Sequence, residues 1–223
     1  MTSIQAFFWD YDNTIFSTAD AHWSKHKVVL AQHGIKLDEL FRKRIYENNG
    51  NQNWEWMREE LGLKVPKEDY LKAVDLEFQN HLFTVEMRPG VSELLEQIGS
   101  SGIPQAIITN ARRDSAEPIL QKRKITSLMK FVLYSEDYVG RKPDPMPYLK
   151  GLEKMKDVLG LSLDLKRCIA VEDDPKGVES AKKAGITVIH RKLNEEDPPS
   201  PYADYVCFHE EEFLKIVNSL LKA

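Results

Sequence analysis

Two aspartates, two positions apart, follow a short apolar run at the beginning of the sequence. The run covers residues 4–9, and Asp10 and Asp12 come directly after it, before the turn former Asn13. Five or six apolar and aromatic residues bounded by turn formers are typical of a buried strand. The carboxyl end of such a strand faces the crevice in which open α/β sheets bind ligands. There one carboxylate can attack or hold a cation while the other transfers protons. The alternative is an Asp-rich turn closed by an Asx hydrogen bond.

Polar residues with related chemistry mark three other places where a predicted strand or turn ends. They are Thr109 and Asn110 after a strand at 104–109, Lys142 in a proline-rich turn before a helix, and Glu172, Asp173 and Asp174 after a strand at 168–172. Taken singly, such residues are most often helix caps or solvated side chains. Their combination in one α/β domain predicts a single polar crevice at the carboxyl edge of a sheet.

The order of the predicted elements indicates an α/β protein with an insertion. From Arg88-Pro89-Gly90 onward, short apolar runs alternate with amphipathic segments, which is typical of a Rossmann-like parallel sheet with helices on both faces. Residues 17–83 show helical periodicity with no strand between the helices. We therefore predict an α/β core of residues 1–15 and 88–223, and an inserted all-helical cap of residues 16–87.

Composition and charge narrow the class of protein. The 223 residues include 35 acidic and 31 basic side chains, for a net charge of −4, and 42% are hydrophobic, which is enough for a sizeable core. The charges are mixed along the chain, so we expect no nucleic-acid partner. We also expect no membrane partner, because no run is long enough to span a bilayer and the N-terminus lacks the pattern of a secretory signal. Cys168 and Cys207 lack metal-site spacing and fit buried thiols in a cytoplasmic protein, which we expect to be a monomer.

The polar strand ends and the helical insertion together resemble the haloacid dehalogenase superfamily, specifically its phosphohydrolases with a helical cap after the first strand. These include relatives such as phosphoglycolate phosphatase and β-phosphoglucomutase. The resemblance covers essentially the whole chain and is carried by Asp10-Tyr11-Asp12-Asn13-Thr14, Thr109, Lys142-Pro143 and Glu172-Asp173-Asp174. It implies that Asp10 is a nucleophile that forms an aspartyl-phosphate. Asp12 would protonate the leaving alcohol and later activate water.

A Mg²⁺ cofactor is also implied by this resemblance. The expected ligands are the Asp10 side chain, the main-chain carbonyl of Asp12 and the carboxylate of Asp173, with Glu172 or Asp174 acting through water. Which of these three later acids touches the metal directly is left open. Mg²⁺ is a hard cation that prefers carboxylates, water and phosphate oxygens, so an acidic cluster suits it.

Three further residues are expected to handle the phosphate. Lys142 adds a fixed positive charge, and Thr109 and Asn110 can donate hydrogen bonds to phosphate oxygens. Together with the metal, these groups would offset the charge of a transferring phosphoryl group, from which most of the catalysis must come. A covalent carboxylate intermediate divides one difficult step into two easier ones.

The presence of Asp12 favours phosphate-ester chemistry over carbon–halogen cleavage, because an oxygen leaving group must be protonated. We expect a phosphatase that acts on a small phosphorylated metabolite, such as a sugar or polyol phosphate. A sugar-phosphate mutase resembling β-phosphoglucomutase is the alternative. A non-catalytic binding protein is a third interpretation, which the competent residues at every motif position disfavour.

Candidate specificity residues lie in the predicted cap. His22 and His26 are one helical turn apart and can face the crevice together, or they are ordinary solvated helix residues. Amide side chains surround Gly50, and this neutral group suits substrate hydroxyls better than a second phosphate. We name it the amide cluster and take Asn53 as its test position; it comprises Asn48, Asn49, Asn51, Gln52 and Asn53. The cluster is equally consistent with a polar loop between two helices.

Overall fold

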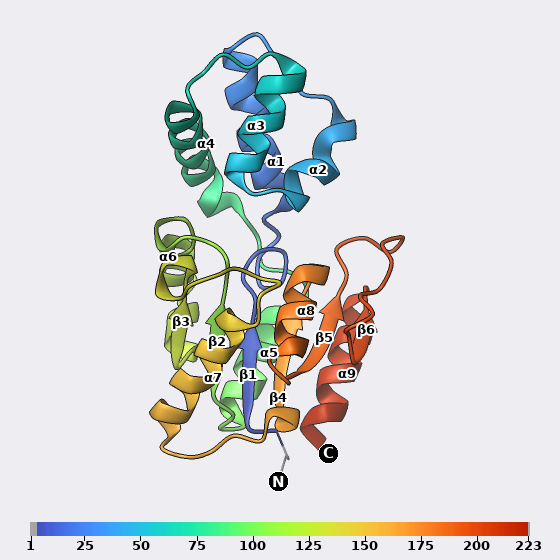
Figure 1. The fold of residues 1–223 in the computed structure, drawn as a ribbon. Coiled ribbons are helices and arrows are strands. Elements are labelled where there is room, and N and C mark those ends of the chain that lie inside the picture. Colours follow the sequence, from blue (N-terminus) through green and yellow to red (C-terminus); the bar gives the residue numbers. More distant parts are fainter. Residues whose placement is uncertain (1–3, 223) are drawn as a thin grey trace. The chain divides into compact units, whose positions relative to one another are not determined.

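The computed structural model describes residues 4–222 and shows two compact units. One unit comprises Met1–Phe16 and Met87–Ala223, and the other comprises Ser17–Glu86. We name them the α/β unit and the helical unit after the elements that they contain (Figure 1).

The α/β unit is organised by a parallel sheet. Within residues 4–222 the sheet has six strands in the order β3-β2-β1-β4-β5-β6. They are β1 (Ala6–Trp9), β2 (Gln105–Ile108), β3 (Phe131–Leu133), β4 (Cys168–Glu172), β5 (Thr187–Arg191) and β6 (Tyr205–Cys207). This is the strand order of a doubly wound Rossmann sheet, and it confirms the predicted fold class. The order reverses between the neighbours β1 and β4, where a ligand crevice is expected.

The central strands β1, β2 and β4 are buried along their whole length because helices cover both faces of the sheet. Figure 1 shows α5 (Val91–Ser100) and α9 (Glu210–Lys222) on one face, and α7 (Met146–Leu159) and α8 (Pro175–Lys183) on the other. Successive side chains of β1 point to opposite faces of the sheet and pack against the helices there. Phe8 meets the ring of Tyr148 edge-on from α7, and Trp9 meets Phe213 edge-on from α9. The remaining helix of this unit, α6 (Arg113–Lys122), follows β2.

The helical unit has a hydrophobic core of its own. Its helices are α1 (Ala19–Gln32), α2 (Arg42–Glu47), α3 (Gly50–Leu61) and α4 (Lys67–His81). Leu30, Met57 and Tyr70 from three of these helices lie in one buried cluster. This unit is the all-helical insertion that the periodicity predicts.

The amide cluster lies at the start of a helix, so the alternative interpretation as a polar loop is wrong for its last three members, which belong to α3. The Asn49 side chain accepts a hydrogen bond from Gln52 N (3.1 Å), and the Gln52 side chain accepts one from Asn49 N (3.0 Å). This capping box satisfies two backbone donors at the start of α3. The helix therefore begins at Gly50 rather than at the first apolar residue, Trp54.

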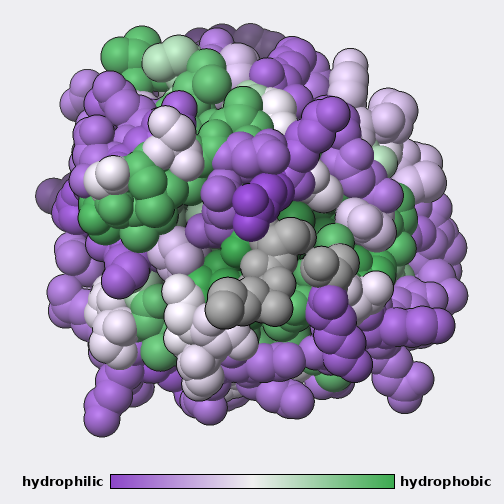
Figure 2. Space-filling model, turned by 90° about the horizontal axis from the view of Figure 1, so that it is seen from below, coloured by the Kyte–Doolittle hydropathy of each residue, from purple (hydrophilic) through white to green (hydrophobic). Residues whose placement is uncertain are grey.

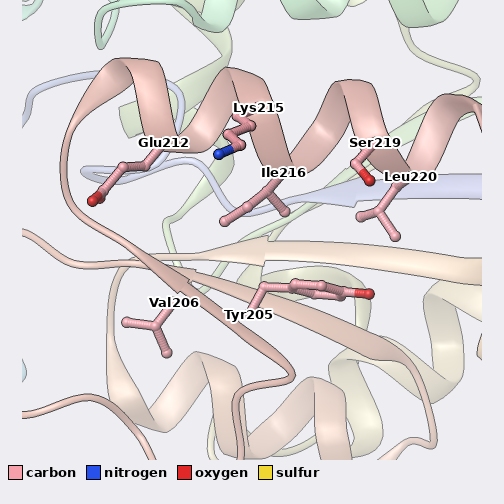
Figure 3. Close-up of a pocket in the computed structure, with 7 residues that line it drawn as sticks. All are labelled: Tyr205, Val206, Glu212, Lys215, Ile216, Ser219 and Leu220. Atoms are coloured by element: carbon pink, nitrogen blue, oxygen red, sulfur yellow. The ribbon is translucent and has the colours of Figure 1, made fainter.

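The surface of the described residues includes a mixed face and one apolar groove. Figure 2 views the molecule from the side of the chain ends, where hydrophilic residues predominate and hydrophobic patches lie between them. No helix among residues 4–222 is long and apolar enough to cross a membrane. A groove of about 390 Å³ lies between β6 and α9, with Tyr205 and Val206 on the strand and Ile216 and Leu220 on the helix (Figure 3). β5 separates this groove from β4, so it is not part of the crevice between β1 and β4.

The chain leaves and re-enters the α/β unit at neighbouring points. Phe16 pairs in antiparallel fashion with Met87, and Arg88 N donates to Ile15 O at 2.9 Å. These bonds hold the two ends of the insertion side by side, so the sheet can keep its geometry whatever is inserted between them.

We expect the α/β unit to fold without the helical unit. An Asn-Gly turn can join Phe16 directly to Met87, because such turns suit adjacent antiparallel segments. The shortened chain should unfold cooperatively on heating and keep a near-ultraviolet circular dichroism signal from fixed aromatic side chains. Helical far-ultraviolet signal without a cooperative transition would contradict this expectation.

Candidate active site

The predicted site residues of the α/β unit follow the carboxyl ends of neighbouring strands. Asp10 follows β1, Thr109 follows β2, and Glu172 ends β4. Trp9 pairs with Val171 in the β1–β4 register, so Asp10 and Glu172 reach the edge of the sheet at the same level. The parallel sheet thus brings together the ends of segments that lie far apart in the chain.

The turn after β1 places its two aspartates near one another. Asn13 lies in the left-handed region with φ of 51°, which Asn tolerates better than most residues. Ile15 N and Phe16 N both donate to Tyr11 O, so the chain folds back directly after β1. Asp10 is buried and Asp12 is half-buried, and the charge of Asp12 contributes to a raised pKa of Asp10. We name residues 10–16 the β1 loop.

Lys142 joins the β1 loop to β4. Its ammonium nitrogen lies 2.6 Å from Asp10 Oδ1 and 2.6 Å from Glu172 Oε1, and it donates to Ile108 O at 2.8 Å. Burial alone would lower the pKa of Lys142, but the two carboxylates raise it well above its ordinary value. The raised pKa favours the charged form of Lys142.

Tyr148 and Gly177 contact Glu172, and neither is predicted as a site residue from the sequence. The Tyr148 hydroxyl on α7 donates a short hydrogen bond to Glu172 Oε1. On α8, Gly177 lies so close that a Cβ there would be 2.1 Å from Glu172 Oε2. The local signal for Tyr148 is only an aromatic residue in the first turn of a helix, and that for Gly177 is only a glycine inside one. Their roles depend on how α7 and α8 pack against β4.

Asp173 completes an acidic cluster with Asp10 and Glu172. One carboxylate oxygen from each of the three lies within 4.8 Å of those of the others. Thr14 Oγ1 donates to Asp173 Oδ1 at 3.2 Å, and His190 Nε2 lies 2.9 Å from Asp173 O. Because His190 Nδ1 accepts from Ser200 N, its Nε2 carries the proton and donates to this carbonyl. Thr14 and His190 are thus further supports of the cluster.

Burial and the repulsion between neighbouring carboxylates favour the protonated forms of Asp10, Glu172 and Asp173. Burial raises the pKa of Asp10 to about 6 and that of Glu172 to about 8, although Lys142 opposes both shifts. Burial, together with the charge of Asp10, also raises the pKa of Asp173 well above its ordinary value. Three carboxylates around one ammonium group carry excess negative charge, which a divalent cation with oxygen ligands would offset.

The remaining predicted residues of this edge have structural partners. Thr109 is fully buried, and its hydroxyl accepts from Ala111 N at 3.0 Å. Asn110 Oδ1 accepts from Lys142 N at 3.2 Å, and its amide nitrogen is the donor that could bind a phosphate. Asp174 Oδ1 accepts from Lys176 N at 2.7 Å and caps α8.

The helical unit uses two of its predicted specificity residues in its own interior. His26 Nδ1 lies 2.6 Å from the Tyr70 hydroxyl, and burial lowers the pKa of His26 well below its ordinary value. Asn53 Nδ2 donates to Ile45 O at 3.0 Å, and Asn53 Oδ1 accepts from Trp56 Nε1 at 2.9 Å. We therefore place neither His26 nor Asn53 in a substrate site. His22 is half-buried and stacks on Phe78, with ring centroids 4.4 Å apart. Its role in specificity stays a prediction.

The buried acid–lysine cluster lies where the strand order of the Rossmann-like sheet reverses, between β1 and β4. This arrangement is typical of an α/β enzyme whose active site contains several carboxylates. The model of the haloacid dehalogenase-like hydrolase family matches residues 7–190. The chain therefore belongs to the haloacid dehalogenase-like hydrolase family, and the predicted resemblance is confirmed.

Several known proteins are similar to this chain along most of its length. N-acetylmuramic acid 6-phosphate phosphatase from Pseudomonas aeruginosa is 28% identical over 226 residues, which cover 98% of this chain and 96% of that protein. (DL)-glycerol-3-phosphatase 2 from Arabidopsis thaliana is 26% identical over 192 residues, covering 84% and 79%. A Thermotoga maritima structure assigned provisionally to a β-phosphoglucomutase has a TM-score of 0.83 at 23% identity, covering 98% and 100% of the two chains. That last likeness shows the fold alone.

Gly177→Ala should displace the Glu172 carboxylate. The new Cβ would lie 2.1 Å from Oε2 and 2.7 Å from Oε1 of a side chain that Lys142 and Tyr148 hold in place. We expect the free energy of unfolding to fall by roughly 1–3 kcal/mol, as in other overpacked interiors, measured by urea denaturation.

Gly99→Ala in α5 is the matched control for this substitution. Its Cβ would meet only Gln105 Nε2 at an ordinary 3.6 Å. Because alanine is the better helix former, this variant should gain up to about 1 kcal/mol of stability. Equal effects of the two substitutions would contradict the proposed packing of Gly177 on Glu172.

The metal-free protein should lose stability as pH rises. Burial raises the pKa of Asp10 to about 6 and of Glu172 to about 8, above their values in the unfolded chain. The folded protein therefore binds more protons between the unfolded and folded pKa values. The stability that this contributes is complete below about pH 4 and is lost as pH passes the folded values.

Thermal unfolding in chelator and in Mg²⁺ checks this pH dependence. We expect the metal-free Tm to fall between about pH 5 and pH 9, and Mg²⁺ to raise Tm more at the upper end, because metals bind ionised carboxylates. Glu172→Gln should flatten the decline around pH 8, since it removes a group whose pKa is raised to about 8. A metal-free Tm that rises over this range would refute the assignment of raised pKa values.

Proposed function

We propose that this chain is a phosphatase that hydrolyses a small, hydroxyl-rich phosphate monoester with Mg²⁺ as its cofactor. The observation that carries the proposal is the buried network in which Lys142 joins Asp10 to Glu172 beside Asp173. A phosphate monoester is an anion, and an anionic nucleophile needs fixed positive charge beside it to approach such a substrate. Membership of a hydrolase family and the phosphatases among the relatives support the same reaction.

The acidic cluster fits a hard divalent cation. Asp10 and Asp173 would hold Mg²⁺ with Glu172 beside them, and the main-chain carbonyl of Asp12 is the further ligand that we propose. When bound, the ion would supply positive charge that neutralises and orients the phosphate. The raised pKa values of the three acids are the cost of assembling this site without that charge.

The chemistry is shared between the two aspartates of the β1 loop. A carboxylate oxygen of Asp10 attacks phosphorus, the ester oxygen leaves with a proton from Asp12, and an aspartyl-phosphate forms. Asp12 then takes a proton from the water that attacks this intermediate, so that inorganic phosphate is released and Asp10 is restored. Lys142 holds Asp10 in its ionised form and, with Thr109 and the Asn110 amide nitrogen, compensates the charge of the phosphoryl oxygens.

The substrate class that we favour is a phosphate on a primary alcohol of a sugar or polyol. N-acetylmuramic acid 6-phosphate and glycerol 3-phosphate, named for the two relatives above, share that chemistry. Because both relatives are phosphatases, hydrolysis is better supported than a mutase reaction. We further propose that the protein acts as a cytoplasmic monomer, with neither nucleic acid nor membrane as a partner.

Asp10→Asn should abolish turnover while leaving the fold intact. The amide keeps the shape of the side chain but removes the attacking charge, so we expect phosphate release to fall by about 10³-fold or more, at least ~4 kcal/mol of barrier. The assay is release of inorganic phosphate from a panel of sugar, polyol and glycolate phosphates in Mg²⁺. Asp157→Asn, an exposed position on α7, is the matched control and should behave as wild type.

Two outcomes would count against this proposal. If Asp10→Asn stayed within about tenfold of wild type, Asp10 would not be the nucleophile. If a sugar 1-phosphate were converted into its 6-phosphate without release of phosphate, the mutase alternative would replace hydrolysis.

A further inference from the structure

Arg88 is a buried charged residue at the point where the chain re-enters the α/β unit. It directly follows Met87, the first residue of this unit after the insertion, and is only 8% exposed. Burying a guanidinium group is costly unless its donors are satisfied. Its N–H groups therefore need acceptors in the surrounding structure.

The guanidinium group of Arg88 binds main-chain carbonyls from two separate segments. Nη1 donates to Asn13 O at 2.7 Å and to Arg191 O at 3.1 Å, and Nη2 donates to Lys192 O at 3.1 Å. The planar guanidinium fork suits such bridging because its donors diverge in fixed directions. One side chain thus ties the β1 loop to the end of β5.

Arg88 also holds the β1 loop through its backbone. Arg88 N donates to Ile15 O at 2.9 Å, two residues beyond the carbonyl that its side chain binds. The first of these attachment points is Asn13 itself, whose φ of 51° lies in the left-handed region that few non-glycine residues adopt. Arg88 therefore stabilises the conformation that orients Asp10 and Asp12.

The same strand end supports the other acid-bearing loop. His190, next to Arg191 in β5, donates to Asp173 O at 2.9 Å. Through Arg88 and His190, the end of β5 is hydrogen-bonded to the loops that carry Asp10 and Asp173. The relative placement of these two acids thus depends on β5, although β5 contributes no carboxylate to the acidic cluster.

We propose that Arg88 is a positioning residue of the active site: its guanidinium group fixes the β1 loop against the end of β5 and thereby aligns the Asp10 carboxylate with Asp173. The proposal rests on the phosphatase function proposed above. Arg88 donates its side-chain hydrogen bonds to main-chain carbonyls, so it acts on the site through the loop and not through contact with the reacting phosphate. Its positive charge also favours the ionised form of Asp173, and Arg88→Lys retains that charge.

Arg191 provides a matched control for the loss of a buried arginine. It is 2% exposed, its Nη2 donates to Pro89 O at 2.8 Å, and its guanidinium carbon lies 4.5 Å from the Phe213 ring centroid. Only its main-chain carbonyl, which substitution retains, accepts from Arg88. Arg191→Met therefore removes a buried guanidinium group without removing a hydrogen bond to the β1 loop.

The test compares Arg88→Met, Arg88→Lys and Arg191→Met in the full-length protein with Mg²⁺. We measure kcat and KM with a chromogenic phosphate ester, Tm, and amide hydrogen exchange of residues 10–16 by mass spectrometry. Arg88→Met should lower kcat by about 30- to 100-fold with KM within about threefold, because a displacement of about 1 Å at the nucleophile has an effect of this size.

The other variants sharpen the comparison. Arg88→Lys keeps the charge but not the fork, so its kcat should lie between those of wild type and Arg88→Met. Exchange of residues 10–16 should rise in both Arg88 variants and stay at the wild-type level in Arg191→Met. Arg191→Met should lower Tm while changing kcat by less than about threefold.

Equal losses of kcat in Arg88→Met and Arg191→Met would overturn the proposal, since they would show a general loss of stability. If Arg88→Met did not fold, wild-type kcat and wild-type exchange of the β1 loop in Arg88→Lys would overturn it equally. If the wild-type protein released phosphate from no ester, the phosphatase proposal would fail by itself. The difference in amide hydrogen exchange of residues 10–16 between Arg88→Lys and Arg191→Met would still decide whether Arg88 holds the loop.

Discussion

The structure depends above all on one buried ammonium group between two buried carboxylates. Lys142 lies 2.6 Å from Asp10 and 2.6 Å from Glu172, and its third hydrogen bond goes to Ile108 O on β2. Isolated charges in a protein interior are very unfavourable, and a buried ion pair is stable only when its geometry and its remaining hydrogen bonds are good. Lys142 satisfies both conditions and joins three neighbouring strand ends.

The packing of two helices follows from this interaction. α7 must present the Tyr148 hydroxyl to Glu172, and α8 must pass the same carboxylate at a glycine, since a Cβ at Gly177 would lie 2.1 Å from it. The acids still outnumber the ammonium group, and burial raises the pKa values of Asp10 and Glu172. An excess of buried acids lowers stability, a common compromise between stability and activity at candidate functional sites.

Much of the architecture could be predicted from local patterns. Apolar runs followed by acids, and amphipathic segments between them, predict the Rossmann-like sheet and the helical insertion, because helix and strand periodicity are properties of short segments. The placement of Asp10 and Asp173 at one edge follows from parallel strands. The start of α3 was harder to predict, because its first residues are a glycine and amides that show no apolar periodicity. A capping box between Asn49 and Gln52 starts the helix there. The buried member of the amide cluster, Asn53, is used between helices of the same unit.

The sequence by itself indicated which residues are candidates for the chemistry and which elements present them. Only the tertiary structure decided what holds these residues in place: Tyr148 and Gly177 against Glu172, Thr14 and His190 on Asp173, and Arg88 on the β1 loop. These contacts join segments far apart in the chain, such as Arg88 with Asn13 and with Lys192. A local pattern cannot reveal them, because a tyrosine, glycine or arginine in one segment carries no record of the segment that packs against it.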